Sequence, residues 1–495
     1  MRQGPLAGRY PAAAAMVMFA LIPYLALSAA IGPVTPIIGR DLQMSPQAMS
    51  LGAGMANAAY AIGTVIAVQF AQLLRQRRIM LVYATLLVIG SVLAAAAQNP
   101  AMFIAGHVLQ GLCTSLLLIA AVPPLALGFG VERFRSTAVI MSMCIFGAVT
   151  VGPAIGGVQA EANAWRPLFW VVAAISAGAF VLALLTFEDT PPADLSAPRS
   201  PLAIGLAAAG SIAAFFGASE LLTHKFLEVR TSGLLGGGLA LIVALIAHQY
   251  RAKRALLTVR PMLTSTIPVA GIVLALCAAA ASISATALTA KLLAARYGPL
   301  HVGLLYLPEL AGAVLTAVLL GVVIDKRALQ YLPLAGMGFL AAGIAVFRIE
   351  LPPTQALTLI GSGLTGIGLG ATVAPALFAA GFSLPAATLQ RVFAIVELLR
   401  AVAAFMIAPV FAHFAVTVGG NVRSGTGIAL WIGLGLAIAG AAVPVLIYLL
   451  GGARPETPQL ERFLGGEGPA WHSPTLLAAR NHATRLRPAE ASVQS

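Results

Sequence analysis

Charged residues are scarce in this 495-residue chain, at 9% of the sequence, while hydrophobic residues make up 59%. Soluble globular domains average roughly 25% charged and about 45–50% apolar residues. The composition therefore argues against a water-soluble enzyme, a coiled coil and a disordered protein. The few charges form short groups between long apolar stretches, which is typical of a polytopic membrane protein.

The sequence also lacks the motifs that mark metal-binding, nucleotide-binding and catalytic sites. Its three cysteines lie in apolar runs without metal-ligand spacing, so we interpret them as small core residues and expect no metal site. There is no GxxxxGK[ST] phosphate loop, no HExxH and no clear Ser/His/Asp set, so neither an enzyme nor a cofactor is expected. The formal net charge of +13 resides in loops without interleaved aromatic residues, which argues against nucleic-acid binding.

About fourteen segments are long enough to span a bilayer, each near the ~20 residues that a hydrocarbon layer requires. The first carries three prolines and is followed at once by another span, so it is not a cleavable signal peptide. The predicted spans are residues 13–38, 48–72, 79–97, 101–128, 135–160, 166–187, 201–219, 232–250, 266–291, 300–324, 329–349, 355–381, 386–413 and 425–450.

The distribution of basic residues orients these spans. With the N-terminus in the cytoplasm, the cytoplasmic loops and tail hold 20 of the 29 Lys and Arg residues, and the opposite loops hold 8. The positive-inside rule then places both termini in the cytoplasm, in the cytoplasmic (inner) membrane of a bacterium. The tail, residues 451–495, has no spanning pattern and is expected to be mostly unstructured.

Two loops resemble one another and indicate an internal repeat. The loop after the second span carries Gln72, Arg75 and Arg78, and the loop after the tenth carries Asp325, Lys326 and Arg327. These copies lie eight spans apart, which fits two six-helix halves with two helices inserted between them. The predicted division is a cytoplasmic N-terminus (1–12), a first half (13–187), an inserted pair with linkers (188–260), a second half (261–450) and the tail (451–495).

The fifth span contains a glycine-rich segment. Its small residues would let a neighbouring helix approach closely, and its proline would bend the helix; tight packing without motion is the alternative interpretation. Trp165 and Arg166 follow at the start of the next span. The segment comprises Gly147, Gly152, Pro153, Gly156 and Gly157.

This GPxxGG segment followed by WRxxF resembles the antiporter motif of the major facilitator superfamily, especially its 14-spanner drug:proton antiporters. His107, Gln110 and Gly111 are similar to that family's RxxQG, with His in place of Arg. The resemblance covers roughly residues 13–450. It implies an all-α major facilitator fold of 6+2+6 helices, acting as a monomer that exports small apolar or amphipathic compounds by alternating access with proton antiport.

The chain departs from the family pattern where the family usually carries charge. Residues 25–30 offer no acid where the family has a helix-one Asp, and His107 replaces the helix-four Arg. Gln72 occupies the place of the Asp in the family's GxxxDR loop. Loss of both partners of a buried pair can be nearly neutral, whereas loss of one costs about 3–5 kcal/mol. The usual coupling pair is therefore absent.

The remaining membrane-embedded ionisable residues are the candidates for coupling. Glu309, about two turns into the tenth span beside Pro308, is either a coupling acid or a carboxyl that reaches water at the outer interface. His107 could exchange protons, since free imidazole has a pKa near ~6.5, or it is a neutral, hydrogen-bonded side chain. Tyr24, His107, Gln110 and Glu309 are the substrate-cavity candidates.

Two charged groups are predicted to act as gates. Glu397 and Arg400 share a helix face near the cytoplasmic end of their span, as a gate or an anchoring ion pair, with a transport role as the alternative. Asp325, with Lys326 and Arg327, is predicted to lock the cytoplasmic side or to be a plain topogenic turn.

Function is therefore predicted as proton-coupled export, with small-molecule substrate, protons and the lipid bilayer as partners. The alternatives are an uncoupled facilitator or importer and a non-transporting membrane sensor or scaffold.

Overall fold

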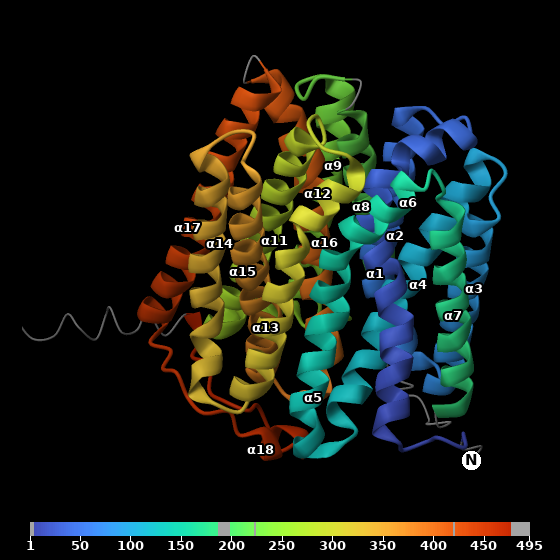
Figure 1. Cartoon of the computed structure of the whole chain (residues 1–495). Helices are drawn as coiled ribbons and strands as arrows, with labels where there is room; N and C mark the ends of the chain where they lie inside the picture. Colours follow the sequence, from blue (N-terminus) through green and yellow to red (C-terminus); the bar gives the residue numbers. More distant parts are fainter. Residues whose placement is uncertain (1–3, 187–198, 222–223, 419–420, 477–495) are drawn as a thin grey trace, which may run out of the picture.

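The computed structural model describes residues 4–186, 199–221, 224–418 and 421–476, and over these it is a bundle of long helices (Figure 1). Fourteen of them are long and apolar enough to cross a membrane, which confirms the predicted number of spans. The N-terminus and the tail helix near residues 460–464 lie at one face of the bundle, here called the terminal face; the opposite face is called the distal face.

The first half contains six spans. The fifth is continuous but changes its winding, because a π-helical turn, η1 (Met143–Gly147), joins α5 to α6. The spans are α1 (Tyr10–Asp41), α2 (Pro46–Leu73), α3 (Gln76–Ala95), α4 (Pro100–Leu127), α5–α6 (Gly130–Ser142 and Ala148–Glu161) and α7 (Arg166–Thr186).

The second half repeats this arrangement. Its second span is broken at Tyr306, between α12 and α13. The spans are α11 (Thr266–Leu293), α12–α13 (Pro299–Leu305 and Leu307–Val323), α14 (Leu332–Ile349), α15 (Gln355–Phe382), α16 (Leu389–Thr417) and α17 (Val422–Gly451). Short helices α10 (Val259–Thr264), η2 (Arg327–Gln330) and η3 (Ala386–Thr388) lie in the connections.

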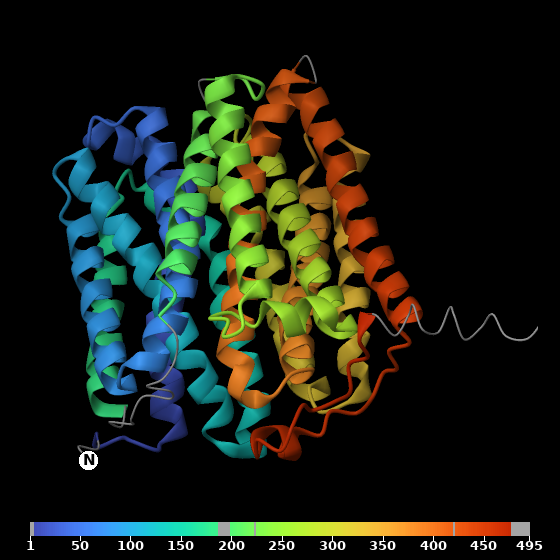
Figure 2. The same cartoon turned by 180° about the vertical axis from the view of Figure 1, so that it is seen from behind.

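Two helices, α8 (Pro201–Glu220) and α9 (Val229–Arg251), stand between the halves in the sequence. They pack closely through small residues: a Cβ added to Gly238 would overlap the backbone nitrogen of Ala214. Helix α8 also contacts α2 of the first half and α16 of the second (Figure 2). The inserted pair therefore covers one side of the junction between the halves.

Four of the helices that enter from the distal face start with a side-chain cap. Ser45, Asn99, Thr354 and Asn421 each accept a hydrogen bond from a backbone N–H of the first turn of α2, α4, α15 and α17. These caps satisfy amide groups that the helix itself leaves unpaired. The position of the distal end of each of these helices is thus fixed by a local polar residue.

The tail differs from the expectation of a mostly unstructured segment over residues 452–476. It forms α18 (Leu460–Leu464), and the Phe463 ring lies 5.2 Å from that of Phe382 at the end of α15. The Trp471 indole donates a 2.8 Å hydrogen bond to Ser383 Oγ. Aromatic burial accounts for this order, which a composition rich in Pro, Gly and Arg concealed. Residues 477–495 lie outside the described part of the chain.

Candidate functional site

A string of aromatic and charged side chains crosses the middle of the bundle from one half to the other. Tyr60, at the middle of α2, donates a 3.2 Å hydrogen bond to Glu397 Oε2 on α16. Arg400 pairs with the same carboxylate, at 2.6 Å between Nη2 and Oε2, and both charged side chains are buried. The Tyr24 ring on α1 stacks at 6.5 Å from that of Tyr60.

This geometry corrects the predicted depth of Glu397 and Arg400. The sequence placed them near the cytoplasmic end of their span, whereas the contact with Tyr60 places them at mid-depth in the bundle. The predicted start of the span, residue 386, agrees with the structure, but Glu397 follows it by 11 residues, which is roughly 16 Å of helix and therefore well inside the bundle. The pair therefore joins the two halves at their centre rather than at one face.

His107 belongs to a polar network inside the first half. Its Nδ1 lies 3.2 Å from Gln110 Oε1, and Gln110 Nε2 donates to Ser91 Oγ at 3.1 Å. The imidazole is buried between the rings of Phe103 and Tyr24, at 6.0 and 5.7 Å. The hydroxyl of Tyr24 is buried with no hydrogen-bond partner among the described residues.

Glu309 is buried in the second half, in the first turn of α13. Its backbone lies directly against Gly366 of α15, where no room for a Cβ remains. Among the described residues, no hydrogen bond or ion pair reaches its carboxyl group, and none joins it to His107. The structure thus places the two predicted coupling residues in different halves and does not bring them together.

The glycine-rich segment of α6 lies between the two halves. A Cβ added to Gly152 would lie 2.5 Å from that of Ala29, and one added to Gly156 would overlap the Ala30 carbonyl oxygen, both on α1. A Cβ added to the adjacent Gly157 would instead lie 2.8 Å from the Cα of Leu300 on α12. Two glycine faces therefore let α6 touch α1 of its own half and α12 of the other. Gly147 closes the π-helical turn, and Pro153 lies inside α6.

At the terminal face the two repeated loops each reach across to the other half. Asp325 accepts an ion-paired hydrogen bond from Arg135 at the start of α5. Gln72, with its amide oxygen assigned toward Arg391 at the start of α16, accepts two hydrogen bonds of 3.0 and 3.1 Å. The other charged residues named for these two loops are exposed at this face: Arg75, Arg78, Lys326 and Arg327. A pocket of about 230 Å³ opens here, lined by Pro123 and Pro124 of the first half and Gln390 of the second.

Sequence reasoning missed Tyr60, Arg135 and Arg391. No local signal marks them, because each is recognised only by a partner far away in the chain; Tyr60 and Glu397, for example, are 337 residues apart. The one available signal was the internal repeat. Asp325 and Gln72 stand in equivalent loops, so if one of them contacts the other half, the second is expected to do the same. Among the described residues, no group of three or more His, Cys, Asp or Glu could hold a metal ion.

Comparisons with known proteins agree with this architecture. A sequence model of the Major Facilitator Superfamily matches residues 17–304. The solved structure of the proton:xylose symporter XylE aligns with a TM-score of 0.60 at 12% identity, covering 88% of this chain and 94% of the symporter. A peptide transporter, POT, aligns with a TM-score of 0.61 at 16% identity, covering 90% and 97%. At these identities the structural likeness concerns the fold.

Three relatives by sequence are named as transporters or resistance proteins. An uncharacterized MFS-type transporter of Bacillus subtilis, YubD, is 25% identical over 387 residues, 76% of this chain and 73% of that protein. A multidrug resistance protein B homolog of Mycobacterium tuberculosis is 28% identical over 58% of this chain and 54% of its own length. The drug efflux pump JefA of the same species is 24% identical over 61% and 60%.

The matches to the two mycobacterial proteins thus span little more than half of their lengths, while the family model covers more than half of this chain. Fourteen apolar helices in two repeated halves agree with that match. The chain belongs to the Major Facilitator Superfamily and is a multi-pass membrane transporter, not an enzyme.

Proposed function

We propose that this transporter exports small apolar or amphipathic compounds across a bacterial inner membrane by alternating access, in exchange for protons. The likeness to a drug efflux pump and a multidrug resistance protein supports the substrate class. The contacts between the halves through α6–α12, Gln72–Arg391 and Asp325–Arg135 support alternating access, because they lie at opposite faces and can be broken one face at a time.

The observation that carries the proton coupling is the buried carboxyl group of Glu309. An ionised carboxylate without a partner is expensive in the membrane interior, whereas a protonated one is not. Such a carboxyl group would stay protonated while the transporter changes from one access state to the other, and it would release its proton where it reaches water. This behaviour suits an antiporter. Glu397 is less suited, since Arg400 and Tyr60 already stabilise its charge.

His107 is the proposed second proton-exchanging group, in the other half. Its ring has one nitrogen bonded to Gln110 and stacks between aromatic side chains that can contact an apolar substrate. Together with Tyr24 and Gln110 it would line the substrate path on the first-half side. In this arrangement His107 serves both protons and substrate on the first-half side, whereas Glu309 serves protons on the second-half side.

The test is transport in vesicles reconstituted with the purified protein, with an imposed pH gradient and a lipophilic cationic dye or a neutral amphiphile as substrate. We expect gradient-driven accumulation in the wild type, its loss in Glu309→Gln and its weakening in His107→Gln. Exchange of substrate for substrate, which needs no proton, should persist in Glu309→Gln. Glu161→Gln, which changes an exposed acid at the distal end of α6, is the matched control.

The alternatives give different results in the same assay. Substrate movement without any dissipation of the pH gradient would identify an uncoupled facilitator or importer. Binding of the substrates without flux in either direction would identify a membrane sensor or scaffold.

A further inference from the structure

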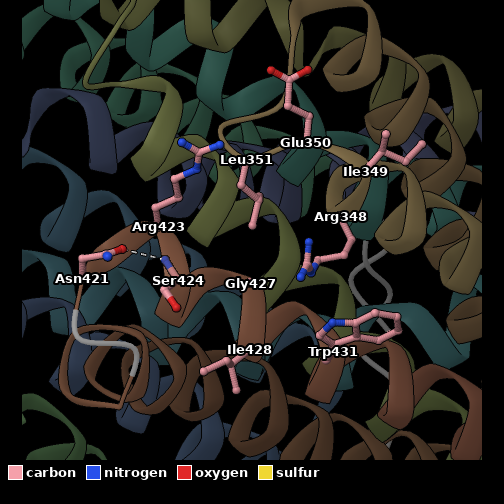
Figure 3. Close-up of a pocket in the computed structure, with 10 residues that line it drawn as sticks. All are labelled: Arg348, Ile349, Glu350, Leu351, Asn421, Arg423, Ser424, Gly427, Ile428 and Trp431. Atoms are coloured by element: carbon pink, nitrogen blue, oxygen red, sulfur yellow. Dashed lines mark hydrogen bonds between the residues drawn. The ribbon is translucent and has the colours of Figure 1, made fainter.

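A second pocket lies away from the junction of the halves, at the distal face. It has a volume of about 450 Å³ and is formed where α14 ends and α17 begins (Figure 3). Helix α17 has most of its surface exposed, so the pocket is at the outside of the bundle, where lipid surrounds the protein. Neither of the predicted coupling residues lines it. It is therefore separate from the proposed transport site.

The pocket carries an excess of positive charge. Arg348 and Arg423 line it with a single acid, Glu350, and among the described residues none of the three takes part in an ion pair. The Nε atom of Arg348 is buried without a hydrogen-bond partner in that part of the chain. A buried guanidinium N–H that no protein group satisfies points to an acceptor from outside the chain.

Arg348 is held in place by its neighbours. Its guanidinium lies 5.6 Å from the centre of the Trp431 ring, in a cation–π contact. Gly427 lies beside it: a Cβ there would be in ordinary contact with Arg348 Nε, at 3.7 Å, and would press on a methyl group of Leu351, at 3.2 Å. The guanidinium group of Arg348 thus lies over the ring of Trp431, in the first third of α17 (Figure 3).

The remaining wall is apolar and exposed. Ile349 is 70% exposed and Trp431 is 56% exposed, and Ile428 continues the same wall on α17, one turn nearer the distal face than Trp431. Trp431 is the tenth residue of the 30-residue helix α17 and lies beside Arg348 at the distal end of α14, and tryptophan is typical of the region near the membrane–water interface. The pocket therefore offers guanidinium groups at headgroup depth and an apolar surface running toward the hydrocarbon layer.

We propose that this pocket binds the phosphate group of an anionic phospholipid from the leaflet at the distal face. Arg348 and Arg423 bind the phosphate oxygens, since guanidinium groups match phosphate geometry with paired hydrogen bonds. The acyl chain lies along Ile428 and Trp431. The bound lipid then holds the distal ends of α14 and α17 together.

The test uses the quenching of Trp431 fluorescence by lipids with brominated acyl chains, in the full-length protein carrying Trp170→Phe. This background removes the other largely exposed tryptophan, while Trp165 and Trp471 are buried. We expect brominated phosphatidylglycerol to quench Trp431 at a lower mole fraction than brominated phosphatidylcholine. The preference should fall about fivefold for each arginine replaced in Arg348→Gln and Arg423→Gln.

Three controls make the result decisive. Arg348→Lys keeps the charge and should retain part of the preference, which separates binding from misfolding. Arg296→Gln removes an exposed arginine elsewhere on the distal face and should leave it unchanged. Soluble glycerol phosphate should compete only weakly. Equal quenching by both lipids, a preference that survives the double arginine variant, or full competition by glycerol phosphate would each overturn the proposal.

Discussion

The ion pair between Glu397 and Arg400 lies where ionic groups are most costly, at mid-depth in a membrane protein. It persists because each charge is satisfied: Arg400 donates to both carboxylate oxygens, and Tyr60 donates to one of them from the other half. Three residues from two halves thus form one electrostatic unit. The consequence of changing any one of them depends on whether its partners remain.

We therefore expect strongly non-additive effects at this unit. Arg400→Gln should destabilise the protein by about 3–5 kcal/mol, because it leaves the Glu397 charge buried and unpaired. The double variant Glu397→Gln/Arg400→Gln should recover most of that loss. The measurement is a double-mutant cycle on denaturant unfolding in detergent micelles. Arg40→Gln, which breaks an exposed pair with Asp41, should cost at most about 1 kcal/mol. Additive losses at Glu397 and Arg400 would contradict this account.

Tyr60→Phe tests the link between the halves separately. It removes the one hydroxyl that bridges to Glu397 but leaves the ion pair intact, so the loss of unfolding free energy should be about 1.5–3 kcal/mol. The change should also raise the rate of exchange between access states, because the bond must break when the halves separate. Tyr83→Phe removes a buried hydroxyl without a described partner and is the matched control. An equal effect of both variants would show that the bridge has no role.

At the scale of the helix, α6 contacts one helix of its own half and one helix of the other half. Gly156 faces α1 within the first half, and Gly157 faces α12 of the second. The π-helical turn directly before α6 provides a point where the span can change its winding. One face of α6 therefore maintains the half, and the other meets a surface that must separate during transport.

Alanine at these two glycines should separate the two roles. Gly156→Ala should cost about 1–3 kcal/mol of unfolding free energy, since it overpacks a permanent contact with Ala30. Gly157→Ala should cost less and instead favour the state open at the distal face, seen as faster thiol labelling of a cysteine placed at Leu300. Gly338→Ala, where the added Cβ meets nothing within 4 Å, should be neutral or slightly stabilising. Equal losses of stability at Gly156 and Gly157 would contradict the division.

At the scale of the whole molecule, the terminal face is closed by two contacts related by the internal repeat. One is an ion pair, Asp325 with Arg135; the other is a neutral amide, Gln72, with Arg391. The neutral contact is the weaker of the two, because only one partner is charged. The chain thus holds the terminal face with unequal strength on its two sides.

Gln72→Asp should complete a second ion pair and favour closure of the terminal face. A gain of about 1 kcal/mol would shift a two-state population about fivefold. Asp325→Asn should shift it in the opposite direction. Distance distributions between spin labels at Arg78 and Lys326, which are exposed on different halves, would report the change. No change of the distribution in either variant would mean that these contacts do not control access.

The described part of the tail adds a further connection across the same face. Phe463 and Trp471 pack on Phe382 of the second half, and α18 contacts α5 of the first. Trp471→Ala should detach this segment, because it removes a buried indole and its hydrogen bond to Ser383. We expect faster tryptic cleavage at Arg462, whereas Trp170→Ala, on a lipid-facing surface, should leave the rate unchanged. Unaltered cleavage in Trp471→Ala would contradict this role of Trp471 in holding the tail segment against the terminal face.

Much of the fold could be predicted because the bilayer imposes it locally. A span requires a long apolar run, so fourteen runs gave fourteen helices, including α8 in the predicted 201–219 segment. The glycine-rich segment was equally visible, since close packing of helices needs small residues in a fixed pattern. Which neighbour each glycine faces was not visible, because Gly156 and Gly157 differ only by a rotation about the helix axis.

The sequence by itself determined the class of protein, the number of spans, the two repeated halves and the scarcity of membrane-embedded charge, since all of these are properties of contiguous residues. Only the tertiary structure decided that Tyr60 meets Glu397, that no hydrogen bond or ion pair among the described residues joins Glu309 to His107, and that part of the tail is packed across the terminal face. The physical reason is that hydrophobicity acts on each segment separately, whereas a hydrogen bond or an ion pair requires two groups brought within a few ångströms by the packing of all the helices between them.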